Sequence, residues 1–142
     1  MTAPPEADRG SLERGLVATV VGLVAAVLVI IMLEPVLERL YPRLEINPLE
    51  AAAQPQATDA LPATSLFLLL GAYALASLVG GLAASLTSGR TRAWPAVTTG
   101  LILMIAGAYA VIVVNQPPWF RAVSFLTYPL AYVAHLLVRK PT

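Results

Sequence analysis

Apolar residues run along this chain in four long windows that contain no Asp, Glu, Lys or Arg: 15–33, 60–89, 93–120 and 122–138. A helix needs about 20 mainly apolar residues to cross the hydrocarbon core of a bilayer. The windows do not alternate polar and apolar positions as membrane-barrel strands do, and backbone amides in lipid must bond within their own segment. The pattern therefore predicts an all-α, polytopic membrane protein with four transmembrane helices in a bundle. The expected spans are 15–33, 66–86, 95–114 and 118–138.

Prolines and polar runs predict the boundaries between the spans. Pro95 and Pro118 each suit a first helical turn, where no amide donor is missed. A short external turn at 115–117 then separates the last two spans. The external loop at 34–65 begins with apolar residues at helical spacing, which either extend the first span or form a short amphipathic helix on the interface. The remaining segments are an N-terminal tail (1–14, disordered over 1–9), an Ala-rich connector within the loop (51–57), a second loop (87–94) and a C-terminal tail (139–142).

The distribution of positive charge predicts the orientation of the chain. Four spans place both termini on one side of the membrane. Six basic residues belong to that side: Arg9, Arg14, Arg90, Arg92, Arg139 and Lys140. Three belong to the other side: Arg39, Arg43 and Arg121. Because positive residues near span ends favour the cytoplasm, we expect a multi-pass protein with both termini cytoplasmic.

Composition supports the membrane interpretation and removes several classes of function. Hydrophobic residues make up 58% of the chain and charged residues only 12%, where soluble domains carry about 25% charged residues. A net charge of +1 gives no electrostatic basis for binding nucleic acid. The absence of cysteine excludes disulfides and thiolate chemistry. The sequence also lacks a nucleophile with a neighbouring base and a phosphate-binding glycine loop, so we expect a protein that is not an enzyme and holds no metal.

Small residues recur at four-residue spacing in three of the spans. Such rows let two helix backbones approach closely in lipid, where dispersion and weak polar bonds drive association. They predict helix-packing faces, either inside one bundle or against a second protein. The residues concerned are Ala18, Gly22, Ala26, Ala76, Gly80, Gly81, Ala84, Ala96 and Gly100.

His135, the only histidine, is the one candidate for cofactor binding. Ala131 precedes it by one helical turn, a spacing that lets a planar macrocycle lie beside a ligating imidazole. Ligation of haem or a chlorophyll-type pigment is therefore a hypothesis for this span. An ordinary interfacial imidazole is the alternative, and no other cofactor is expected.

The fourth span also carries a predicted irregularity. Pro129 leaves a backbone carbonyl without its amide partner and is expected to kink the helix. Tyr128 and Tyr132 lie beside it, and together the three residues form a candidate cleft for a ligand or lipid. At the ends of the third and fourth spans, Trp94 and Trp119 are expected to anchor at headgroup level and Arg121 to extend its charge outward.

Short motifs in the second half of the chain resemble those of small, uncharacterised bacterial four-helix integral membrane proteins. The motifs are Gly80-Gly81-x-x-Ala84, Gly89-Arg90-x-x-x-Trp94, Gly100, Pro117-Pro118-Trp119-Phe120 and Pro129. The resemblance implies location in a bacterial inner (cytoplasmic) membrane and brings no catalytic residues.

Three hypotheses of function follow from these patterns. The first is a non-enzymatic accessory or structural subunit, which packs through its small-residue faces against other membrane subunits or a second copy. The second is a small solute transporter or lipid-handling protein. The third is a pigment- or haem-binding subunit that ligates through His135.

Overall fold

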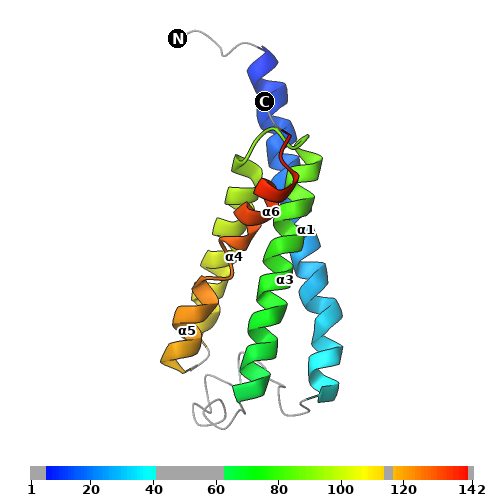
Figure 1. Ribbon diagram of the computed structural model, residues 1–142. Coiled ribbons are helices and arrows are strands. Elements are labelled where there is room, and N and C mark those ends of the chain that lie inside the picture. The colour runs from blue at the N-terminus through cyan, green and yellow to red at the C-terminus, as the bar shows by residue number, and fades with distance from the viewer. Residues whose placement is uncertain (1–5, 41–62, 114–116, 141–142) are drawn as a thin grey trace.

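The computed structural model describes residues 6–40, 63–113 and 117–140. These residues form five helices and no strand: α1 (Glu6–Leu40), α3 (Ala63–Thr87), α4 (Trp94–Val113), α5 (Pro118–Phe125) and α6 (Leu130–Val138). In Figure 1, α1, α3 and α4 run along one another, and α6 follows α5 along one line. We refer to α1, α3, α4 and the α5–α6 pair as the four rods of the bundle. The predicted all-α four-helix bundle is confirmed.

Three of the rods are long and apolar enough to cross a membrane: Gly10–Leu37, Ala63–Thr87 and Pro118–Val138. The remaining rod, α4, has 20 residues, which at about 1.5 Å per residue corresponds to about 30 Å. Large apolar side chains such as Leu16, Ile105 and Leu137 are exposed on the outside of the bundle. This outward-facing apolar surface is the one that hydrocarbon would cover.

Helix α1 is longer than the expected span of 15–33. It begins at Glu6, so the disorder expected for residues 6–9 is wrong, and it continues through Pro35 to Leu40. A proline inside a helix removes one backbone hydrogen bond, and here the helix goes on beyond that loss. Of the two alternatives for the start of the external loop, extension of the first span holds for residues 34–40. The connector at 51–57 and the turn at 115–117 fall largely or wholly outside the described residues.

The start of α1, the end of α6 and the turn between α3 and α4 lie at the same end of the bundle (Figure 1). The Arg92 guanidinium donates a hydrogen bond to the Ser11 carbonyl at 3.1 Å, and the Lys140 amide donates to the Arg90 carbonyl at 3.3 Å. We call this the terminal end of the bundle. The position of α1's start and α6's end at the same end of the bundle agrees with an even number of membrane crossings.

The turn after α3 is formed by two residues with left-handed backbone. Gly89 has φ 84° and Arg90 has φ 67°. The Arg90 amide bonds the Ser85 carbonyl at 2.8 Å and the Gly89 amide bonds the Leu86 carbonyl at 3.2 Å, the pair of bonds that defines a Schellman motif. Glycine carries little steric cost at the first of these positions, so the helix ends here and the chain turns toward α4.

The helices approach one another through glycine and alanine. A methyl group added at Gly22 of α1 would lie 2.7 Å from the Gly80 carbonyl oxygen of α3 and 2.8 Å from the Thr99 hydroxyl of α4. Gly81 of α3 lies directly against the backbone of Ala131 in α6. All nine residues of the small-residue rows are buried, and these contacts join helices of a single chain.

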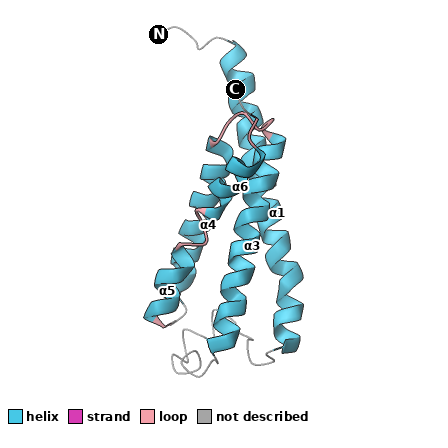
Figure 2. Ribbon diagram, viewed as in Figure 1, coloured by secondary structure: helices cyan, strands magenta, loops and turns pink. Residues whose placement is uncertain are grey.

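The fourth rod is interrupted before Pro129 (Figure 2). Amides of residues 126, 127, 130, 131 and 132 bond carbonyls three residues earlier, at 3.0–3.2 Å, in place of four. The Thr127 hydroxyl donates to the Ser124 carbonyl at 2.7 Å. Since proline has no amide to continue the α-helical ladder, the chain tightens into turns, and the expected kink takes the form of a break between α5 and α6.

Candidate functional site

The three residues of the expected cleft line one cavity on the side of the bundle. This cavity, the Tyr128 cleft, has a volume of about 310 Å³. Tyr128, Pro129 and Tyr132 form one wall. The α4 residues that complete it are Ala96, Val97, Gly100, Leu101 and Met104. Because all five are apolar, a hydrocarbon chain suits the cleft better than a hydrated solute does. Occupation by a lipid stays a prediction.

A second cavity lies where α1, α3, α4 and the α5–α6 turn meet. We call it the central cavity, and its volume is about 260 Å³. Ile30 of α1 and Tyr128 of the turn line it together with residues of the two other helices. Those residues are Tyr73, Ala76, Ser77, Leu103, Ala106, Gly107 and Ala110. The Tyr128 side chain therefore stands between the two cavities, with its hydroxyl directly over Gly107.

Ser77 differs from the other buried Ser and Thr side chains of the described helices. Ser85 and Thr99, for example, each donate to the carbonyl four residues earlier, at 2.8 Å, which is the usual way a hydroxyl is satisfied within a membrane helix. Ser77 is 1% exposed and lines the central cavity. Within the described residues its hydroxyl has no hydrogen-bond partner. A buried hydroxyl without a partner is costly in apolar surroundings, so this oxygen is a candidate contact for a bound molecule.

His135 is buried at the contact between α6 and α3. Its Nδ1 lies 3.2 Å from the Ser85 hydroxyl, which already donates its one proton to the Gly81 carbonyl. The imidazole must therefore donate through Nδ1, and the Tyr132 ring stacks on it with centroids 6.3 Å apart. Ala131, beside which a macrocycle would have to lie, is fully buried against Gly81 and Gly100. These contacts are those of a packed helix interface.

The three expected interface anchors lie at the two ends of the bundle. Trp94 begins α4 at the terminal end and its indole packs directly on Gly15 of α1. Trp119 lies in the first turn of the fourth rod at the opposite end, where its ring centroid is 5.4 Å from that of Phe67. Arg121 follows on α5 and is partly exposed. Their depth in a bilayer stays a prediction.

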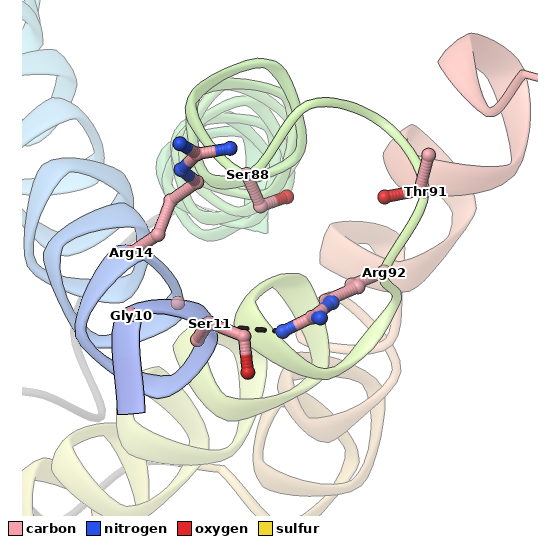
Figure 3. A pocket seen from close by; sticks show the side chains of 7 residues that line it. Gly10, Ser11, Arg14, Ser88, Thr91 and Arg92 are labelled. Carbon is pink, nitrogen blue, oxygen red and sulfur yellow. Dashed lines mark hydrogen bonds between the residues drawn. The ribbon is translucent and has the colours of Figure 1, made fainter. Parts of the chain in front are cut away.

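A polar pocket that the sequence patterns do not predict lies at the terminal end (Figure 3). This arginine pocket has a volume of about 350 Å³. It is lined by Gly10, Ser11, Arg14 and Gly15 of α1 and by Ser88, Thr91 and Arg92 at the α3–α4 turn. The signal in the sequence was the gathering of basic residues on the side of the termini, which we used only for orientation. The described residues contain no cluster of three or more His, Asp or Glu side chains that could hold a metal ion.

Comparisons with protein-family models, with characterised proteins and with solved structures found no match to this chain. The resemblance to small bacterial four-helix membrane proteins therefore stays a prediction.

Proposed function

We propose that this chain is a non-enzymatic membrane protein that binds a lipid-soluble molecule in the central cavity. The occupant has an apolar body and an oxygen that accepts a hydrogen bond, as the ester carbonyl of a membrane lipid does. The observation that carries the proposal is the Ser77 hydroxyl, which lines the cavity, is buried and has no partner among the described residues.

The lining of the cavity supports this class of ligand. Apart from the hydroxyls of Tyr73, Ser77 and Tyr128, the side chains around it are aliphatic. Ligand sites of this kind combine a mainly apolar wall with a few polar groups that fix orientation. A strongly hydrated solute or ion would find too few polar partners here to replace its water. We therefore place lipid handling ahead of solute transport.

A role in binding also fits the shortage of chemical groups. The described residues of the cavity lining include no carboxylate, imidazole or amine. Their serine and tyrosine hydroxyls therefore have no neighbouring base in this lining to activate them. Hydrogen bonding and shape are what these groups offer. The protein accordingly binds its ligand without converting it chemically.

Photo-crosslinking with a phosphatidylcholine that carries a diazirine on its acyl chain tests the proposal. The full chain is reconstituted in vesicles that contain this lipid, irradiated and digested, and the labelled peptides are identified by mass spectrometry. We expect labelling of cavity-lining residues on α3 and α4 in the natural chain. Ala106→Leu, which adds bulk at the cavity lining, should reduce that labelling. Ala122→Leu makes the same change at an exposed position outside the cavity lining and should leave it unchanged.

Ser77→Ala separates the hydroxyl from the volume of the cavity. It should reduce labelling of the cavity-lining peptides, because it removes the proposed donor while leaving the space open. Equal labelling in the natural chain, Ala106→Leu and Ser77→Ala, with all variants folded, would refute the proposal and assign the labels to lipid around the outside of the bundle.

An accessory subunit is the second candidate, and the outer half of α1 is the observation that favours it. Beyond Ala26, every described side chain of α1 is exposed or only partly buried, including Met32 at 75% exposure. The small-residue rows do not support this hypothesis, because they pack between helices of the same chain. Native mass measurement of gently extracted protein tests it: a complex that dissociates on Ile31→Arg would support it, and a monomer without partners would count against it.

A further inference from the structure

We infer that the arginine pocket is a binding site for a phosphate group at the membrane boundary. The site is formed by Arg14 of α1 with Thr91 and Arg92 of the α3–α4 turn. The inference does not depend on the proposed function, because its residues and those of the central cavity are different and lie in different parts of the bundle.

The pocket brings together donors suited to an oxyanion. Figure 3 shows Arg14 and Arg92 on opposite sides of the pocket, with the hydroxyls of Ser88 and Thr91 turned toward the space between them. Arg92 uses one nitrogen to bond the Ser11 carbonyl, which fixes its guanidinium and leaves further donors. The Arg14 guanidinium and the Thr91 hydroxyl have no hydrogen-bond or ion-pair partner among the described residues. Guanidinium groups bind phosphate through paired hydrogen bonds.

Among the described residues that line the pocket, none carries a negative charge that would compete with such a ligand. The seven lining residues include two arginines and no carboxylate. Arg90, Arg139 and Lys140 add positive charge at the same end of the bundle. The Ser88 hydroxyl donates to the Ser85 carbonyl at 3.0 Å, so it is not counted among the donors. The electrostatic character of the pocket is therefore that of an anion site.

The sequence positions of the pocket residues predict the depth of the pocket in the membrane. Arg14 immediately precedes the first charge-free window, and Arg92 is two residues before Trp94, which packs on Gly15 beneath the pocket. Tryptophan and arginine at span ends are typical of the headgroup region. A phospholipid headgroup and free inorganic phosphate both present the phosphate oxygens that the pocket fits. Anionic lipid is the source that basic residues near a bilayer attract.

Titration of the full chain in a mild detergent tests the inference and distinguishes the two sources. The probes are dihexanoyl-phosphatidylglycerol, dihexanoyl-phosphatidylcholine and sodium phosphate, all at constant ionic strength. We expect saturable binding of the phosphatidylglycerol, weakened about tenfold or more by Arg14→Gln or Arg92→Gln, because each removes charge-assisted hydrogen bonds. Arg139→Gln removes the same charge from the same end but from outside the pocket lining, and should change the affinity less than about twofold.

Phosphatidylcholine should bind more weakly, because its choline cation offsets the phosphate charge. Competition by millimolar sodium phosphate would assign the site to the free ion, and binding of the lipid alone would assign it to a headgroup. Arg14→Lys and Arg92→Lys control for misfolding of the glutamine variants. They keep the positive charge and should therefore retain part of the affinity. The inference is overturned if neither phosphatidylglycerol nor sodium phosphate shows saturable binding, or if Arg139→Gln weakens binding as much as the two pocket variants.

Discussion

The contact between Gly81 and Ala131 makes the stability of the bundle sensitive to a single methyl group. In Gly81→Ala the new Cβ would meet three backbone atoms of Ala131, and its carbonyl carbon would be only 2.6 Å away. Backbone cannot rotate aside as a flexible side chain does, so α6 has to move away from α3. That displacement also loosens the His135–Ser85 hydrogen bond, which joins the same two helices.

The size of the effect follows from two opposing terms. Alanine in place of glycine favours a helix by about 0.5–1 kcal/mol. Forcing an extra carbon into a close-packed contact costs about 1–3 kcal/mol, and a rigid backbone neighbour argues for the upper part of that range. We expect Gly81→Ala to lower the free energy of unfolding by about 1–2 kcal/mol, from the difference between these terms.

Gly71 supplies a matched control in the same helix. A methyl group there would have nothing within 4 Å, so Gly71→Ala should leave the stability unchanged or raise it. Thermal unfolding in detergent, followed by circular dichroism, compares the variants. Ala131→Gly should not rescue Gly81→Ala, because the atoms that are met belong to the Ala131 backbone. Equal midpoints for Gly81→Ala and Gly71→Ala, or rescue by Ala131→Gly, would refute the packing argument.

Two further predictions concern the α3–α6 hydrogen bond and the orientation of the chain. Ser85→Ala leaves the buried His135 Nδ1 proton without an acceptor and should cost about 1–3 kcal/mol of stability. Thr87→Ala removes an exposed hydroxyl bonded to its own helix and should change the unfolding midpoint little. Equal effects of the two substitutions would contradict the assigned His135–Ser85 hydrogen bond. The chain has no cysteine, so each single-cysteine variant reports on one position. In intact bacterial cells a membrane-impermeant maleimide should label Leu40→Cys. It should label Thr91→Cys and Arg139→Cys only after the membrane is permeabilised. The reverse pattern would overturn the cytoplasmic placement of the termini.

The fold was predictable because its main signal is one-dimensional. Charge-free runs of helix length mark membrane helices without any knowledge of their neighbours, and Pro118 does begin its rod. The extent of α1 was not predictable from the same signal. Residues 6–14 and 34–40 are polar enough to lie outside hydrocarbon, yet they continue the helix in both directions, because hydropathy reports the solvent around a helix and does not report where its backbone hydrogen bonds end.

Some features of the candidate sites could likewise be predicted from the sequence, and others could not. The Pro129 irregularity could be found because proline acts locally, through its missing amide. The arginine pocket could not, because Ser11 and Arg92 are 81 residues apart and meet only when α1 packs beside the α3–α4 turn. Ser77 gives no signal in the sequence, where it is one of several span hydroxyls, and only the three-dimensional hydrogen-bond pattern separates it from Ser85.

The internal use of the small-residue rows changes where function should be sought in this bundle. A row such as Ala18, Gly22 and Ala26 is compatible with a partner protein only while its neighbour is unknown, and the structure fills that place with α3. At the Gly22–Gly80 contact the helix backbones nearly touch, whereas the larger side chains of Ile30 and Leu103 line the central cavity. Ser77 contributes a polar group to this cavity. The packing faces thus hold the bundle together, and the central cavity beside them is where we propose that a lipid-soluble molecule binds.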